Sequence, residues 1–170
     1  MNKHILLSVL FPLTLLILTA CGGGETSVPV RTTAVLKVNL SGNLGNKAIA
    51  GASFTLTLPA NVTPATVNNA VATSVVTPSG TFAGTTIAPV VTYTPAAGTT
   101  SGTMQIVVTS SIAAGVITAG EVATITLQLA NGAVPAAVDF SLSSVPVNVI
   151  DTLGNTVPGI AANVSEVTVL

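Results

Sequence analysis

Apolar and polar residues alternate with a period of two along most of this chain. In residues 34–40 the even positions are all apolar, and in residues 121–130 the odd positions from 123 onward are Ala, Ile, Leu and Leu. Successive side chains of a strand point to opposite faces, so this alternation predicts strands with one buried face. About nine such segments are predicted, over residues 34–40, 52–58, 71–76, 81–87, 90–94, 104–108, 121–130, 140–149 and 164–170.

Clusters of Gly, Pro, Asn and Asp separate these segments and predict the turns. They lie at residues 41–46, 78–80, 99–102, 131–132 and 151–156, the last as a hairpin-like turn. Residues 110–120 are mostly small and form a connection with room for one helical turn at 112–114. A stretch this short and interrupted by Gly does not sustain a helix on its own.

The segment 140–149 changes its inward phase. Phe140 and Leu142 occupy even positions, whereas Val145, Val147 and Val149 occupy odd ones. One extra residue in a strand shifts every later side chain to the other face, so a β-bulge is predicted near residues 143–144, ahead of Pro146.

These patterns predict an all-β domain over residues 32–170, folded as an antiparallel β-sandwich. The chain is 49% hydrophobic and only 5% charged. Disordered chains show the opposite balance, and no apolar run in this region approaches the length of a membrane span. One packed domain without disulfides is therefore expected.

The first twenty residues have the form of an export signal. Lys3 and His4 precede an apolar run over residues 5–17. A run of this length is shorter than the ~20 residues of a spanning helix, so residues 1–20 are predicted to be a signal helix that is cleaved off. Residues 21–31 then form a tether of small and polar residues.

Leu18-Thr19-Ala20-Cys21 resembles the lipobox of bacterial lipoproteins. The resemblance implies cleavage between Ala20 and Cys21, a diacylglyceryl group on the Cys21 thiol, and an amine acylated by a fatty acid such as palmitate. Two or three acyl chains anchor a protein durably, at about 0.8 kcal/mol per buried methylene. The bilayer is then one partner. Because Gly22 replaces the aspartate that retains some lipoproteins in the inner membrane, the outer membrane of the bacterial cell envelope is the expected location.

Four segments together resemble cohesin-like modules. They are AGASFTLTLP at 50–59, GTMQIVV at 102–108, AGEVATITL at 119–127 and the turn DTLGN at 151–155. The resemblance implies a nine-stranded jelly-roll sandwich, shared with several carbohydrate-binding modules. It also implies a non-catalytic domain that binds a partner protein, a dockerin in true cohesins, or a glycan in the related modules.

The expected function is a membrane-anchored, non-catalytic binding or scaffold module that recognises another envelope protein. Two alternatives stay open, namely a glycan-binding module and a structural or adhesive surface subunit. Phe54 and Phe140 are in inward phase and are predicted to lie in the core. Tyr93, the one tyrosine of a chain without tryptophan, is the candidate contact for a ligand.

Residue types argue against catalysis, metals and nucleic acid. The single histidine and the single cysteine are His4 and Cys21, so neither remains available for a catalytic group in the domain. Four Lys and Arg stand against five Asp and Glu, which excludes the basic stripe of a nucleic-acid binder. No catalytic residue, metal ligand or cofactor is predicted.

The carboxylates of the domain have a simpler expected role at loops. Glu121, Asp139, Asp151 and Glu166 lie at strand starts or turns, where such groups cap and solubilise loops. A glycosidase would need two of them to face each other. Asp151 and Asn155 could instead hold a calcium ion through their side-chain oxygen atoms, although a turn stabilised by both side chains is favoured.

Overall fold

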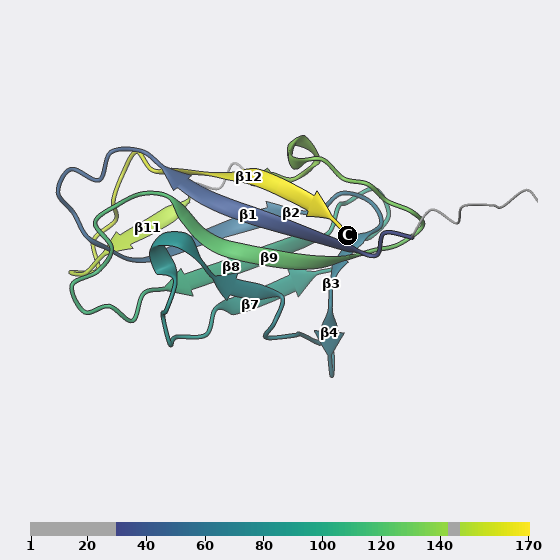
Figure 1. Cartoon of the computed structure of the whole chain (residues 1–170), viewed down its shortest axis with the longest axis horizontal. Coiled ribbons are helices and arrows are strands. Elements are labelled where there is room, and N and C mark those ends of the chain that lie inside the picture. The colour runs from purple at the N-terminus through teal and green to yellow at the C-terminus, as the bar shows by residue number, and fades with distance from the viewer. Residues whose placement is uncertain (1–29, 143–146) are drawn as a thin grey trace, which may run out of the picture.

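The computed structural model describes residues 30–142 and 147–170, which form two antiparallel sheets packed face to face (Figure 1). We call them the β1 sheet and the β2 sheet. The β1 sheet has the order β12, β1, β9, β3, and β6 pairs with β9 farther along the same strand. Its strands are β1 (Thr33–Ser41), β3 (Val62–Pro64), β6 (Val76–Pro78), β9 (Glu121–Leu129) and β12 (Ala161–Val169).

The β2 sheet has the order β10, β2, β8, β7, with β11 also paired to β2. Its strands are β2 (Ile49–Thr57), β7 (Val90–Thr94), β8 (Thr103–Thr109), β10 (Ser141–Leu142) and β11 (Asn148–Asp151). Outside both sheets lie a two-stranded ribbon, β4 (Thr66–Val67) and β5 (Ala70–Val71), and two 3₁₀ turns, η1 (Gly80–Phe82) and η2 (Ala137–Asp139).

Alternate residues of both sheets form one hydrophobic core. Leu36 of β1 and Ile106 of β8 are fully buried, as the period of two predicts. Phe54 and Phe140 are also buried, which confirms their predicted place in the core. In β9 the predicted inward residues are buried, namely Ala123, Ile125, Leu127 and Leu129.

The chain passes from one sheet to the other six times between β1 and β12. Among the longer strands, β7 and β8 are sequential neighbours that pair directly within one sheet. Because six of the nine steps between successive strands of the two sheets change sheet, the two layers are joined at both ends of the sandwich. The all-β, antiparallel two-sheet architecture agrees with the sequence prediction.

Two predicted strands are wrong. The segment 71–76 is divided by a turn closed by the Val75 N–H and the Ala72 carbonyl, so only its ends belong to β5 and β6. The segment 81–87 is η1 followed by a loop, because Gly80 and Gly84 adopt positive φ angles of 54° and 79° that interrupt a strand. The described residues form twelve strands where about nine were predicted, because 71–76 and 140–149 each contain parts of two strands and the short strands β3 and β4 were not predicted.

Two local predictions can be compared with the structure, and a third only through the residues on either side of it. The predicted turn at 151–156 is present, since Ile150 bridges Thr156 across it. Residues 112–114 form no helix; a single turn closes from the Gly115 N–H to the Ile112 carbonyl. Leu142 pairs with Leu56, and Asn148 pairs with Ser53. The buried positions change from even to odd between these pairs, and the predicted bulge at 143–144 lies outside the described residues.

The predicted signal helix at 1–20, with Ala20, and the tether residues 21–29, with Cys21, also lie outside the described residues. Within the described part, no helix is long and apolar enough to cross a membrane. The first described strand begins beside the last residue of the chain, because the N–H groups of Thr32 and Thr33 donate to the Leu170 carbonyl. The start of β1 and the last residue of the chain therefore lie side by side (Figure 1).

Candidate binding groove

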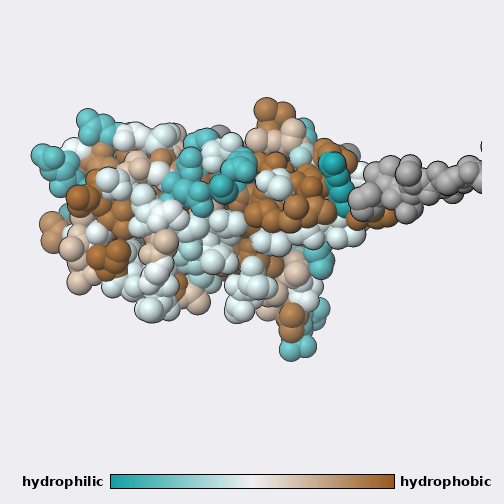
Figure 2. All heavy atoms as spheres, viewed as in Figure 1, coloured by the Kyte–Doolittle hydropathy of each residue, from teal (hydrophilic) through white to brown (hydrophobic). Residues whose placement is uncertain are grey.

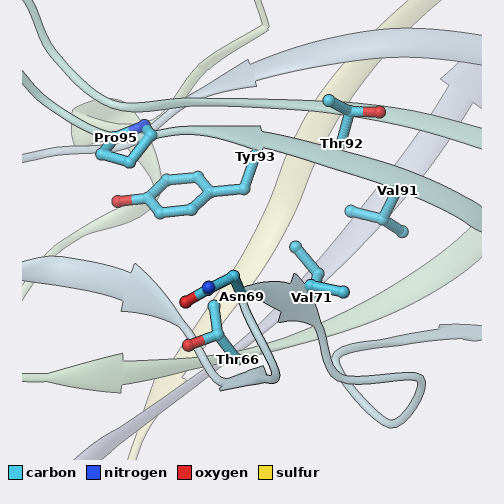
Figure 3. Close-up of a pocket in the computed structure, with 8 residues that line it drawn as sticks. Thr66, Asn69, Val71, Val91, Thr92, Tyr93 and Pro95 are labelled. Atoms are coloured by element: carbon cyan, nitrogen blue, oxygen red, sulfur yellow. The ribbon is translucent and has the colours of Figure 1, made fainter.

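Tyr93 lies on β7, the strand at one edge of the β2 sheet. Its side chain is half-buried and packs against the rim of the core, on the same side of the strand as Val91. The polar side chains of Thr92 and Thr94 point to the opposite, solvent-exposed face. The alternation of β7 therefore turns its one aromatic ring away from the outer face of the sheet and toward the space beside it (Figure 3).

A short ribbon of β4 and β5 stands beside this strand and projects from the sandwich (Figure 1). Thr66 pairs with Val71 and Val67 with Ala70, which leaves Asn68 and Asn69 as a two-residue turn. Their φ angles are 51° and 64°. Two positive φ angles define the type I′ turn, which asparagine tolerates better than other residues with a side chain, so Asn-Asn fits this hairpin.

The ribbon and β7 enclose a groove of about 560 Å³ (Figure 3). Uncharged residues of both elements line it: Thr66, Asn69, Ala70, Val71, Val91, Thr92, Tyr93 and Pro95. Apolar surface from Val71, Val91 and the tyrosine ring lies beside the hydroxyl group of Thr66 and the amide group of Asn69. This mixture of apolar surface with a few polar groups is typical of a binding site.

Tyr93 also lines a second hollow, of about 240 Å³, between the loops at 58–63 and 96–102. A Cβ built on Gly102 would lie 3.4 Å from both the Cε2 and the Oη atoms of Tyr93. The ring thus rests against a backbone that carries no side chain at this point. Because it lies between two hollows, Tyr93 is the residue that a ligand in either one would contact.

The surface around the groove carries few charges. Figure 2 shows one face of the molecule, on which pale residues of intermediate hydropathy and brown hydrophobic patches alternate, while the strongly hydrophilic residues form small separate groups. A positively charged ligand would need one or more of the four predicted carboxylates.

Asp151 organises the turn that follows β11. Its Oδ1 accepts hydrogen bonds from the N–H groups of Leu153 at 2.9 Å and Asn155 at 2.8 Å. The bond from Asn155 is the largest of the effects that lower the pKa of the Asp151 carboxyl, burial opposes them, and the Lys47 ammonium at 3.9 Å adds to them least. Asp151 is buried, and its oxygen atoms already serve the turn.

Glu166 forms an ion pair with Lys37, at 2.8 Å, across β12 and β1. Each side chain is about half exposed, at 53% and 43%. Their mutual hydrogen bond, and then the charge of each partner, lowers the pKa of Glu166 and raises the pKa of Lys37. Pairs exposed to this extent contribute little to stability.

The remaining two carboxylates accept hydrogen bonds from residues close to them in the chain. Asp139 accepts the Ala136 N–H at 2.8 Å beside η2, and Glu121 accepts the Thr124 hydroxyl at 3.4 Å. Within the described ranges, no three residues of the types His, Cys, Asp and Glu come together in a group that could hold a metal ion. The structure thus brings none of the four predicted carboxylates into the Tyr93 groove.

Sequence reasoning singled out Tyr93 but missed the ribbon that forms the other wall. Thr66, Asn69 and Val71 carry no chemical motif, and the strands of the ribbon are too short to show a period. The Asn68-Asn69 pair was the available signal, because adjacent asparagines favour a tight hairpin. Neither a family model, nor a curated protein, nor a solved structure matches the chain.

Proposed function

We propose that this chain is a lipid-anchored, non-catalytic binding module of the bacterial cell envelope, which recognises a partner protein through the Tyr93 groove. The observation that carries the proposal is the groove itself, in which a half-buried tyrosine on an edge strand faces a projecting ribbon. Tyrosine is enriched at recognition sites because it offers a large apolar ring and a hydroxyl group together.

The arrangement of the sheets supports a cohesin-like jelly roll as the particular type of sandwich. Three of the four segments with that resemblance, 50–59, 102–108 and 119–127, contribute to β2, β8 and β9 at the centre of the two sheets. The fourth, 151–155, is the turn that Asp151 organises. Repeated passage of the chain between the two sheets is a further property that jelly rolls share.

The lipobox supports the anchor. Residues 21–31 would be the tether between an acylated Cys21 and β1, and eleven extended residues span at most about 35–40 Å. A sandwich on such a tether stays close to the bilayer and meets partners there at a high local concentration. The outer membrane remains the proposed location.

The anchor is tested by expressing the full chain and its Cys21→Ser variant in a bacterium, with radiolabelled palmitate. We expect the natural chain in the membrane fraction after a high-salt wash and carrying label, and the variant in the soluble fraction without label. A Ser27→Ala variant in the tether is the matched control and should behave like the natural chain. A Cys21→Ser protein that stays wholly with the membranes would contradict the anchor.

Partner recognition is tested with the soluble Cys21→Ser form as bait in crosslinking pull-downs from envelope and secreted proteins, with and without calcium. We expect a discrete partner that Tyr93→Ala loses and Tyr93→Phe retains, since phenylalanine keeps the ring. The same set of captured proteins for all three forms would show that the groove is not the recognition site.

A glycan ligand is the second candidate, and the position of Tyr93 between two hollows favours it, because a ring open on two sides can stack on a sugar. Affinity electrophoresis in gels that contain individual polysaccharides tests this. Tyr93→Ala should abolish retardation, and Tyr93→Phe should preserve it. If no tested polysaccharide retards the protein, the glycan candidate is rejected.

A further inference from the structure

The direction of each backbone group along β8 follows from two hydrogen bonds at its ends. The Leu58 N–H donates to the Gly102 carbonyl, and the Ser110 N–H donates to the Ala50 carbonyl, both at 2.8 Å. In an antiparallel pair, hydrogen-bonded positions recur at every second residue. The even-numbered residues of β8 therefore point their backbone groups to β2, and the odd-numbered ones point theirs to β7.

The backbone groups of β7 also alternate in direction. Thr92 pairs with Gln105, and Thr94 with Thr103, so the even residues of β7 point their N–H and C=O groups to β8. Val91 and Tyr93 must then point theirs to the outer edge. Within residues 30–142 and 147–170, β7 has a ladder with β8 alone. Two N–H and two C=O groups thus point outward along this edge of the β2 sheet, beside the side chains that line the groove.

The groove borders the free edge of β7. The β4–β5 ribbon stands over the side chains of β7, with Val71 toward Val91 and Asn69 toward Tyr93 (Figure 3). The ribbon lies too close to β7 for a strand to fit between them, and a second whole sheet would meet the ribbon, whereas a single segment can lie along the outer edge of β7 beside it. A strand added here would pair with Val91 and Tyr93 and extend the β2 sheet by one position.

The charge of the groove defines the chemistry of that segment. None of its eight lining residues is charged. A segment with Asp, Glu, Lys or Arg at its centre would bury a charge without a partner, which costs far more than the contact returns. The complementary segment is uncharged, with an apolar residue toward Tyr93 and alternate residues toward solvent.

We propose that the groove binds an extended, uncharged polypeptide segment of a partner protein, which adds a strand to β7 by hydrogen bonding to the backbone of Val91 and Tyr93. This inference rests on the proposed function, for which it names the class of ligand. Main-chain hydrogen bonds provide affinity in this mode, and the pocket beside Tyr93 provides selectivity.

The test is a fluorescence-anisotropy titration of the full-length Cys21→Ser protein. The probe is a labelled peptide with the sequence of β8, residues 103–109, flanked by lysines for solubility; this uncharged strand already pairs with the other edge of β7. Val91→Pro removes one outward N–H without touching the ladder to β8. Val91→Ala is its matched control, because it loses the side chain but keeps the N–H group.

Saturable binding of the probe is expected, with an affinity about tenfold lower for Val91→Pro and at most about twofold lower for Val91→Ala. A peptide with aspartate in place of its central isoleucine should bind at least about tenfold more weakly than the probe. The inference is overturned if the probe does not bind at about 1 mM, or if Val91→Pro and Val91→Ala bind it equally. Such a failure leaves the anchor and the glycan candidate intact, because fractionation and affinity electrophoresis do not depend on the peptide.

Discussion

The two edge strands β7 and β12 are built in opposite ways. β12 has nine residues, and its register with β1 shifts by one residue where Ser165 has no partner. Beside that shift, Glu166 pairs with Lys37, and the Ser165 hydroxyl donates to the Lys37 carbonyl at 3.3 Å. β7 has five residues, no charge and an unbroken register with β8.

This difference separates an edge that resists pairing from one that permits it. Bulges and charges on edge strands prevent sheets from joining edge to edge, and β12 has both. The outer edge of β11 is covered in another way, because the chain after its turn pairs with it: the Val157 N–H donates a hydrogen bond to the Val149 carbonyl at 2.8 Å. On β7, its shortness, the flanking Pro89 and Pro95 and the neighbouring β4–β5 ribbon limit pairing. A free edge of this kind suits a short binding segment.

The largest effect is expected when proline replaces a β7 residue whose N–H group points to β8, compared with one whose N–H group points outward. Thr92→Pro should lower the free energy of unfolding by about 2–3 kcal/mol, because it removes an N–H group from the ladder with β8. Val91→Pro should stay within about 1 kcal/mol of the natural chain, since its N–H group points outward. Urea unfolding of both variants measures this, and equal losses would show that the assigned phase of β7 is wrong.

A smaller effect is expected at the covered edge of β11. Asp151→Ala should lower the urea midpoint and speed hydrogen exchange at Val157, because the turn loses the acceptor of two N–H groups. The pKa of Asp151 is lowered in the fold, so its contribution is present above about pH 4, the ordinary value, and is lost as the pH falls through the folded pKa.

The pH dependence supplies the control for that variant. Urea midpoints of the natural chain should fall as the pH is lowered below about 4, and those of Asp151→Ala should fall less. Glu166, whose pKa is also lowered, contributes to the same range in both proteins, so the difference between the two curves isolates Asp151. Parallel curves would contradict the role of Asp151 in the turn.

Deleting Ser165 should convert β12 into an open edge with little loss of stability. The pairs Val38–Val164 and Lys37–Glu166 on either side of the shift can remain as they are, so the strand becomes regular. We expect association that rises with protein concentration in analytical ultracentrifugation, while the natural chain stays in one state. A deletion variant that sediments like the natural chain would show that the bulge does not protect this edge.

The smallest effect is expected from Glu166→Gln, which removes the ion pair on β12. Its side chains are about half exposed, so the urea midpoint should fall only slightly. The difference from the natural chain should vanish in about 1 M salt, where the Debye length is about 3 Å. A large difference that persists in salt would mean that this pair contributes more to the edge than its exposure suggests.

Strands that carry the core were predictable from the sequence, because their alternation records burial on one face. β1, β2 and β8 follow their predicted phase, with Leu36 and Ile106 fully buried. β9 follows it from Ala123 onward, but Val122, predicted on the outer face, is also fully buried where the register with β1 shifts. Phe82 shows the limit of this approach. It is fully buried in η1, in a segment that was predicted as a strand. The loop after η1 is held by a hydrogen bond from the Thr85 hydroxyl to the Thr109 carbonyl.

The groove was only half predictable. Tyr93 could be singled out by residue type, but its second wall depends on which elements the topology places beside β7. The outward direction of the Val91 and Tyr93 backbone groups depends on the register between β2, β8 and β7, and no residue type encodes that register. A site made of backbone groups leaves little trace in side-chain identity.

Amide hydrogen exchange of β7, followed by NMR, tests the open edge most directly. In the free Cys21→Ser protein, we expect fast exchange at Val91 and Tyr93 and slow exchange at Thr92 and Thr94, whose N–H groups bond to β8. Addition of the residue 103–109 peptide should slow Val91 and Tyr93 alone. Slow exchange at all four amides in the free protein would contradict the open edge, because it would mean that the outer side of β7 is already covered.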